Sequence, residues 1–210
     1  MVLKDLDQPY RDSIENTILQ LKESSKRIEN DYLFDLNKNE ITVAILERLK
    51  SFYKTQQETK TFLNKRYQTA GADFFVETII FFIQLYLKSK KSDLEVHSER
   101  QIRPKKKMIR PDISIWRGNE VVAIIECKTQ LGWNRKNWEN DFNSREMKLK
   151  REFPNAKAFL LVMTGLNWGG FENNENLGTK YFCLLENIWP INYNDTTQIK
   201  TPIEGLIRQL

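Results

Sequence analysis

The strongest constraint on the fold is a pair of apolar segments on either side of a short polar turn. Residues Asp112–Trp116 and Val121–Thr129 are rich in isoleucine and valine, and Gly118-Asn119 lies between them. Two such runs around a turn of this kind are typical of a β-hairpin. We therefore expect an antiparallel pair of strands, with a sheet built around it.

Charged side chains mark the ends of this hairpin. Asp112 opens the first segment, and Glu126 and Lys128 close the second. Residues two apart on a strand share a face, so Glu126 and Lys128 are expected to point the same way. A two-residue loop at Gly118-Asn119 would pair Asp112 with Ile125. Only a three-residue loop, or a β-bulge in one strand, would pair Asp112 with Glu126.

The surrounding pattern predicts an α/β domain. The strongly apolar segment 71–88 is expected to be a helix, and the polar segment Asn134–Phe153 a second helix. Three further strands are expected, at Leu94–Ile102, Ala158–Thr164 and Tyr181–Leu185. This order is typical of a mixed central β-sheet flanked by helices.

Residues 1–70 are expected to form a helical region packed on a core of residues 71–210. The first helix carries an apolar stripe of Ile14, Ile18, Leu21, Ile28 and Tyr32. Asn39 is expected to cap a second helix, and residues 56–70 to form a loop. The alternative to packing on the core is a subdomain that dimerises or embraces DNA. At the other end, Thr201-Pro202 is expected to begin a short last helix.

Composition excludes several classes of protein. Two cysteines cannot build a disulfide framework or a four-thiolate zinc site, and they indicate a reducing, cytoplasmic setting. The longest apolar stretch, Phe74–Leu87, contains polar residues and is short for a membrane span. No signal peptide is visible, and no glycine-rich phosphate-binding motif occurs. We therefore expect no membrane contact and no nucleotide cofactor.

The net charge of +5 is unevenly distributed. Between Arg100 and Arg151 there are 14 Lys/Arg and 6 Asp/Glu, a balance of +8, which leaves −3 for the rest of the chain. A concentrated basic surface suits a polyanion such as nucleic acid. The alternative is a solvated surface without a partner.

Two carboxylates beside a lysine suit the hydrolysis of phosphate esters. Mg²⁺ prefers oxygen ligands and is usually held by one or two carboxylates, waters and substrate phosphate. Such an ion activates a bound water and stabilises charge on the attacked phosphate. Asp112 and Glu126 are the candidate ligands, with the backbone carbonyl of Cys127 as a third. The Lys128 ammonium can orient or help deprotonate the water.

The order of these residues matches a known family. Pro111-Asp112, followed after thirteen residues by Glu126-Cys127-Lys128, resembles the motif of the PD-(D/E)xK nuclease superfamily, which has a restriction-endonuclease-like fold. The resemblance covers about residues 71 to 165, where the expected order of elements is similar to the family core. The helix before the first strand of that core often carries a glutamate that faces the metal site, and Glu77 matches it. The alternative for Glu77 is an ordinary solvated helix edge.

The resemblance implies a Mg²⁺-dependent endodeoxyribonuclease that hydrolyses phosphodiester bonds in double-stranded DNA. It implies that Asp112 and Glu126 hold the metal, that Lys128 handles the attacking water, and that Glu77 assists. Within the family we expect a type II restriction endonuclease that works as a homodimer. A junction resolvase, a repair nuclease or a mobile-element nuclease is the alternative, and a non-catalytic DNA-binding module is the rival from another class.

Basic and polar residues near the motif are candidates for contacts with DNA phosphates. They are Lys105, Lys106, Lys107, Arg110, Gln130, Arg135, Lys136, Arg145 and Lys148. Gln130 continues the strand face of Glu126 and Lys128, and either joins the site or is a strand-end residue in solvent.

Overall fold

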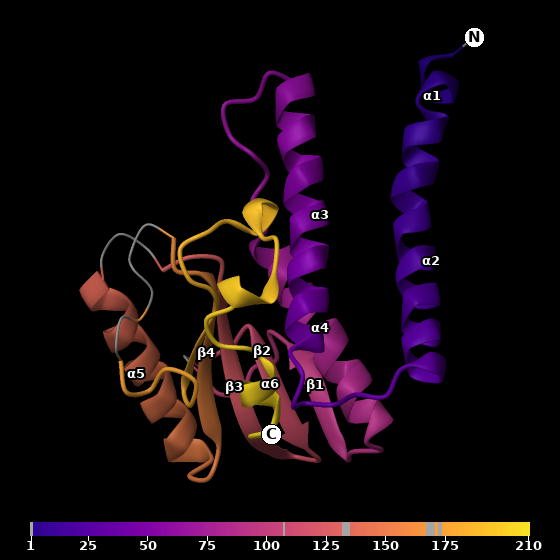
Figure 1. The fold of residues 1–210 in the computed structure, drawn as a ribbon. Coiled ribbons are helices and arrows are strands. Elements are labelled where there is room, and N and C mark those ends of the chain that lie inside the picture. The colour runs from indigo at the N-terminus through magenta and orange to yellow at the C-terminus, as the bar shows by residue number, and fades with distance from the viewer. Residues whose placement is uncertain (1, 107, 132–134, 167–170, 172–173) are drawn as a thin grey trace.

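The protein has an α/β fold, in which N-terminal helices precede a mixed β-sheet flanked by helices (Figure 1). The computed structural model describes residues 2–106, 108–131, 135–166, 171 and 174–210, except for the side chains of residues 135–137. No helix among these residues is both long and apolar enough to cross a membrane.

The described strands form one five-stranded sheet in the order β1-β2-β3-β4-β5. The strands are β1 (Leu94–Ser98), β2 (Ile113–Arg117), β3 (Glu120–Lys128), β4 (Lys157–Thr164) and β5 (Tyr181–Leu185). The first three strands are antiparallel, and β3, β4 and β5 are parallel to one another. The predicted strands are confirmed, although β1 ends four residues earlier than expected, at Ser98 rather than Ile102.

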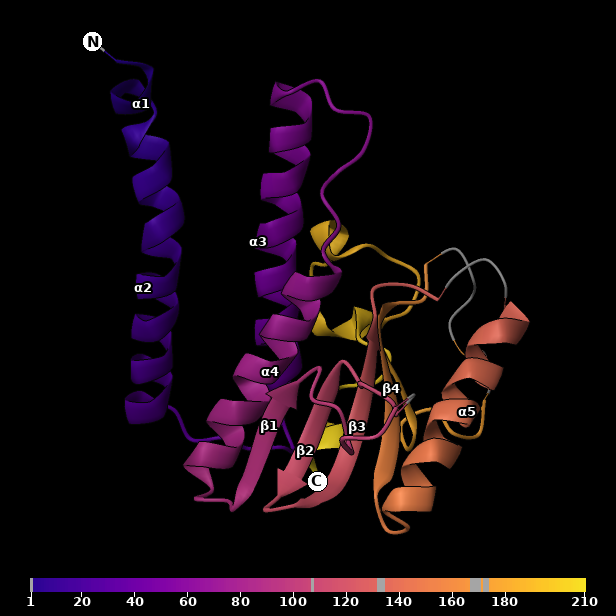
Figure 2. The same ribbon diagram turned by 180° about the vertical axis from the view of Figure 1, so that it is seen from behind.

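Of the four longer helices described, three lie on the faces of the sheet and the first stands apart from it (Figures 1 and 2). They are α2 (Gln8–Asp31), α3 (Glu40–Phe62), α4 (Ala72–Ser89) and α5 (Arg135–Glu152). Short helical turns complete the chain: α1 (Leu3–Leu6), η1 (Pro190–Asn192), η2 (Thr196–Gln198) and α6 (Glu204–Ile207). The predicted helices 71–88 and 134–153 correspond to α4 and α5. The expected loop at 56–70 is wrong in its first part, because α3 continues to Phe62.

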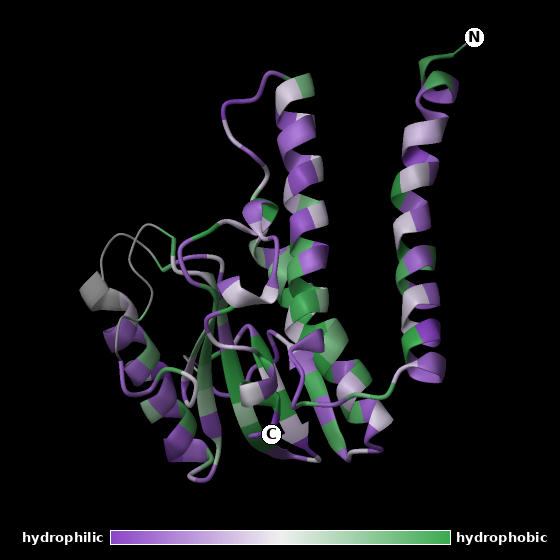
Figure 3. Cartoon of the chain, in the orientation of Figure 1, coloured by the Kyte–Doolittle hydropathy of each residue, from purple (hydrophilic) through white to green (hydrophobic). Residues whose placement is uncertain are grey.

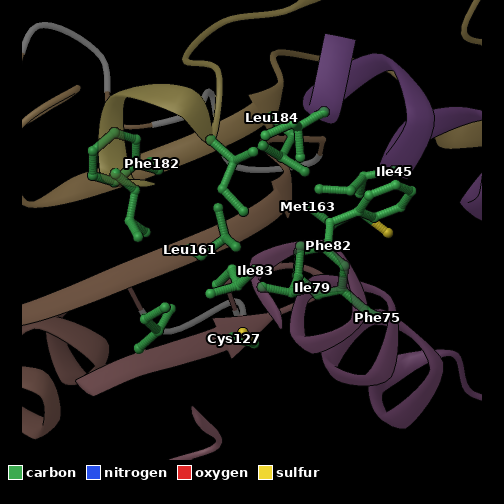
Figure 4. Packing of buried hydrophobic residues seen from close by; sticks show 14 of the residues in the cluster. Ile45, Phe75, Ile79, Phe82, Ile83, Cys127, Leu161, Met163, Phe182 and Leu184 are labelled. Atoms are coloured by element: carbon green, nitrogen blue, oxygen red, sulfur yellow. The ribbon is translucent and has the colours of Figure 1, made fainter. Parts of the chain in front are cut away.

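Two apolar clusters hold the sheet, one on each face. On one face, α3 and α4 pack on the sheet, and Ile79 and Ile83 of α4 lie beside Leu161 of β4 (Figure 4). On the other face, Phe142 and Leu149 of α5 belong to the cluster around the opposite side of β3 and β4. Each buried Leu, Ile or Phe contributes roughly 1.5–3 kcal/mol. The central strands are therefore covered on both sides, as parallel sheets require.

Strand β3 alternates between these two clusters. Ala123, Ile125 and Cys127 belong to the cluster of α3 and α4, whereas Ile124 belongs to the cluster of α5. Because side chains alternate along a strand, Glu126 and Lys128 continue the Ile124 face. The charged end of the hairpin is therefore directed toward α5.

The N-terminus of α3 is capped by a residue from the far end of the chain. The buried carboxylate of Glu204 accepts hydrogen bonds from the backbone N–H groups of Ile41 (2.8 Å) and Thr42 (3.0 Å), and from the Thr42 hydroxyl (2.5 Å). Asn39 holds the N-cap position but makes no side-chain capping bond. The expected cap of the last helix is wrong, because the Thr201 hydroxyl bonds the Cys183 backbone instead.

Helix α2 corrects the expectation that the whole N-terminal region packs on the core. None of the described residues of α2 is buried, and Ile14 and Ile18 are 56% and 50% exposed. Its C-terminal half approaches the body. Leu21 and Ser24 line a hollow with Phe74 of α4, Ile28 contacts the core cluster, and Glu29 pairs with Lys88 of α4 at 2.6 Å. Figure 3 shows hydrophobic residues recurring along this separate helix.

Candidate active site

A β-bulge brings the two motif carboxylates opposite each other. The hairpin has the two-residue loop, with Arg117 paired to Glu120, and Gly118 adopts φ = 56°, which glycine tolerates best. Trp116 pairs with Val121, but Ile115 pairs with Ala123, so Val122 is an extra residue in β3. Ile113 then lies opposite Ile125, and the next pair in that register is Asp112 and Glu126. From the sequence, the pairing of these two carboxylates required either a three-residue loop or a bulge, and the bulge is confirmed.

Asp112, Glu126 and Lys128 meet at the end of this hairpin. The Asp112 carboxylate accepts a hydrogen bond from the backbone N–H of Cys127 at 2.7 Å. The Lys128 ammonium nitrogen lies 3.5 Å from Asp112 Oδ2 and 4.0 Å from Glu126 Oε2. One ammonium group therefore bridges two carboxylates. Glu126 and Lys128 line the α5 side of the sheet, whereas Asp112 borders a hollow that it shares with Asp73 and Glu77 of α4.

Glu126 is the most unusual member of the group. Only 3% of the residue is exposed, and its Oε1 accepts a hydrogen bond from Arg145 of α5 at 2.9 Å. Burial, and next the negative charge of Asp112, raise the pKa of Glu126 to about 7, although Arg145 and Lys128 oppose the shift. The loss of hydration around Glu126 therefore outweighs the attraction of the two cations beside it.

The candidate ligands are oxygen atoms, which Mg²⁺ prefers. Among the described residues, no group of three or more His, Cys, Asp or Glu side chains is arranged to hold a metal ion. Mg²⁺ needs fewer protein ligands than that, since waters and phosphate complete its shell. Asp112 and Glu126 supply two carboxylates. The Cys127 carbonyl lies on the same strand edge as its N–H, which bonds Asp112.

The Cys127 thiol itself is unsuited to ligation. The residue is buried, and burial raises the pKa of its thiol well above the ordinary value. A thiol ligates metals as the thiolate, which this environment disfavours. Its side chain belongs to the apolar cluster of α3 and α4, so only its backbone faces the site.

A cleft of about 680 Å³ opens between the end of β3 and α5. Glu126, Lys128 and Gln130 all line it, as expected for one strand face. Helix α5 contributes Asp141, Ser144, Arg145 and Lys148 to the opposite wall. Sequence reasoning missed Asp141 and Ser144, although their spacing from Arg145 and Lys148 places all four on one side of a helix.

Glu77 borders a different hollow. This smaller space, about 320 Å³, is lined by Asp73, Glu77, Glu99 and Asp112, among others. Glu77 is exposed on α4, so the cost of burying a carboxylate does not apply to it, and it lies on the solvated helix edge that was the alternative. It shares a wall with Asp112 but not with Glu126. Its assisting role stays a prediction.

The other basic residues surround this region in different ways. Lys105 is paired with Glu152 of α5 at 3.0 Å, whereas Lys106, Arg110 and Lys148 are exposed. Lys107 lies outside the described residues, as do the side chains of Arg135 and Lys136 at the start of α5. The Arg110 carbonyl accepts a further bond from Arg145 at 3.4 Å, which links the basic loop to the site.

Comparisons with known proteins find a distant likeness among solved structures. No family model matches the chain, and no curated protein matches its sequence. Among solved structures, the chain is similar to one described as the native BbvCI A2B2 tetramer at low resolution. The two are 13% identical, with a TM-score of 0.32, over 91% of this chain and 93% of the other. A likeness of this size carries no functional conclusion.

Proposed function

We propose that this protein is a Mg²⁺-dependent endodeoxyribonuclease that hydrolyses phosphodiester bonds in double-stranded DNA. The observation that carries the proposal is the bulged hairpin, which sets Asp112 opposite Glu126 with Lys128 within 4.0 Å of both carboxylates. A structural hairpin has no need to gather like charges and to leave one of them buried. Such perturbed groups cluster at functional sites.

Each member of the group has a separate task in this reaction. Asp112, Glu126 and the Cys127 carbonyl would hold Mg²⁺, which when bound supplies an activated water and stabilises charge on the phosphate. The Asp112 carboxylate is already oriented by the Cys127 N–H. The Lys128 ammonium, 47% exposed at the mouth of the cleft, is placed to orient the attacking water and to stabilise developing negative charge.

The surrounding charge supports DNA as the substrate. Lys148 and Arg145 on α5 line the cleft of the carboxylate site, and the backbone of Arg110, on the loop before β2, is bonded to Arg145. Lys106 is exposed on the same loop. Phosphate contacts from such residues position a duplex without reading its sequence. Gln130 lines the same cleft and is the one uncharged candidate for a DNA contact.

The separate helix α2 supports a homodimer. Leu3, Leu6, Tyr10, Ile14, Ile18 and Leu19 are exposed along α1 and α2, and burial of each removes roughly 100 Å² from water. Their sum approaches the area per partner of a standard interface. Residues 1–31 contain five Lys/Arg and seven Asp/Glu, so this arm suits a second copy of the chain better than DNA.

A restriction endonuclease of type II is the branch we favour, because a dimer with one site per chain can cut both strands by two-fold symmetry. The alternatives are a junction resolvase, a repair nuclease or a mobile-element nuclease of the same fold. The rival from another class is a DNA-binding module without catalysis.

Run-off sequencing of plasmid DNA incubated with the protein and Mg²⁺ separates these functions. We expect cuts at one fixed sequence, on both strands, and none when EDTA replaces Mg²⁺. Cutting confined to branched DNA would favour a resolvase. Binding of DNA without any cutting, over a range of sequences and junctions, would favour the DNA-binding module.

A further inference from the structure

Arg145 supplies the positive charge that a bound metal ion would otherwise provide beside the Glu126 carboxylate. Its Nη1 donates a hydrogen bond to the buried Glu126 carboxylate at 2.9 Å and reaches the Arg110 carbonyl at 3.4 Å. The guanidinium comes from α5, whereas Asp112 and Lys128 come from the hairpin. The ion pair therefore spans the cleft from one wall to the other.

The charges of this group balance without a metal. When both carboxylates are ionised, Asp112 and Glu126 carry two negative charges, and Lys128 and Arg145 carry two positive charges. A divalent cation bound between the carboxylates would leave an excess of two positive charges. Such an excess disfavours the cation unless one positive side chain moves away or an anion arrives.

The Arg145 side chain has room to move. It is 39% exposed and lines the 680 Å³ cleft, next to the exposed Lys148 on the same helix. A guanidinium binds phosphate oxygens in the same two-pronged manner as it binds a carboxylate. Lys128 lies within 4.0 Å of both carboxylates, so its departure would remove positive charge from both, whereas Arg145 pairs with Glu126.

We propose that Arg145 is a displaceable counterion, which holds Glu126 in the metal-free protein and transfers to a DNA phosphate when the metal ion binds. This inference rests on the proposed function and adds a coupling to it. The phosphate supplies the negative charge that the metal-loaded site lacks, and the cation frees the guanidinium that the phosphate needs. Metal and DNA each strengthen the binding of the other by the same factor.

Calorimetric titration with Ca²⁺, a hard cation that takes oxygen ligands, measures this coupling. It is performed on the full chain, with and without a 20-base-pair duplex of mixed sequence, since phosphate contacts do not depend on sequence. We expect the duplex to raise the Ca²⁺ affinity of the wild type by about tenfold or more, within the usual range of coupling between sites. Arg145→Gln should bind Ca²⁺ about tenfold more tightly than the wild type without DNA, and the duplex should raise its affinity less than threefold.

Arg151→Gln is the matched control, because Arg151 is an exposed cation on the same helix that does not line the cleft. It should keep the wild-type Ca²⁺ affinity in the absence of DNA. If Arg145→Gln also keeps that affinity, or if the duplex enhances Ca²⁺ binding to it as much as to the wild type, the inference is overturned. Should Arg145→Gln fail to fold, Arg145→Lys replaces it, since the shorter side chain keeps the charge but reaches Glu126 less well. Its Ca²⁺ affinity without DNA is expected to rise about threefold, and an unchanged affinity would overturn the inference.

Two further variants separate this inference from the proposed function. Asp112→Asn and Glu126→Gln should each abolish Ca²⁺ binding. If Ca²⁺ binding survives both substitutions, the metal site and the proposed function fail together with the inference. If binding is lost in both variants but is unchanged in Arg145→Gln, only the role of Arg145 fails.

Discussion

Glu126 is subject to two opposing demands. As a metal ligand it has to be ionised, yet it lies in a strand whose neighbours Ile124 and Leu160 are buried. The burial and the adjacent Asp112 raise its pKa to about 7. The motif predicted the residue type and its face, because alternation along a strand is regular. It could not predict Arg145 as the partner, because that contact depends on how α5 lies across the sheet.

The raised pKa of Glu126 predicts a pH-dependent cost in stability. The ordinary pKa is 4.5, so between pH 4.5 and about 7 the folded chain retains a proton that the unfolded chain releases. The free energy of unfolding therefore falls as pH rises through this window, by up to about 3 kcal/mol. Glu126→Gln should be more stable than the wild type at pH 8 by about 1–3 kcal/mol and should match it near pH 4.5.

Urea denaturation at pH 4.5, 6 and 8 measures this difference. Glu95→Gln serves as the control, since Glu95 is largely exposed on β1. A Glu126→Gln variant that is less stable than the wild type at pH 8 would contradict the account of a costly buried charge.

The same pKa predicts how metal binding depends on pH. A metal ion binds the ionised carboxylate, so a proton competes with it below pH 7. The Mg²⁺ affinity should reach a plateau above pH 7 and should be about tenfold weaker at pH 6. Calorimetry in two buffers of different ionisation enthalpy should detect about one proton released at pH 6. An affinity that is constant from pH 6 to pH 8 would contradict Glu126 as a ligand.

At the scale of elements, local patterns predicted the sheet better than the helices at its margin. The strands follow from apolar runs and a glycine turn. The apolar pattern did not predict the bulge at Val122, which was expected only because one of two arrangements was needed to pair Asp112 with Glu126. The cap of α3 by Glu204 joins residues more than 160 positions apart, so a local capping motif at Thr201 gave a misleading signal. An apolar stripe on a helix indicates that one face is suited to burial, but it does not predict which surface buries that face. The stripe of α2 is not buried by the rest of the chain.

The exposed stripe of α2 predicts a dimer that depends on apolar contacts. The double substitution Ile14→Asp and Ile18→Asp places two charges in the expected interface, where desolvation would disfavour association. We expect the wild type to be a dimer and the variant a monomer in light scattering coupled to size-exclusion chromatography. Leu33→Asp is the control, since Leu33 is 93% exposed in the connection between α2 and α3. A variant that remains dimeric would exclude α2 as the interface.

The whole molecule divides into a basic side and a mildly acidic arm. The excess of positive charge lies between Arg100 and Arg151, which includes the hairpin and α5, whereas residues 1–31 have a net charge of −2. The sequence predicted the basic segment because charge is counted directly. It could not predict that Lys105 would be paired with Glu152, which leaves Lys106 and Lys148 as clearer candidates for DNA contact.

This division predicts which lysines determine the salt dependence of DNA binding. Each lysine that contacts a phosphate adds about one to the slope of log affinity against log salt. Lys148→Ala should reduce that slope by about one, while Lys22→Ala on the acidic arm should leave it unchanged. Fluorescence anisotropy of a labelled duplex from 50 to 200 mM salt measures the slopes. Equal slopes for both variants would remove the cleft from the DNA interface.

The central claim is that the bulged hairpin hydrolyses DNA, and Lys128→Ala tests it most directly. The measurement is the initial rate of plasmid cleavage in Mg²⁺, with DNA binding in Ca²⁺ followed in parallel and Lys54→Ala on α3 as the control. We predict a loss of about 10²–10³-fold in rate for Lys128→Ala with DNA binding retained, because both carboxylates remain. Cleavage by Lys128→Ala at the wild-type rate would contradict the account.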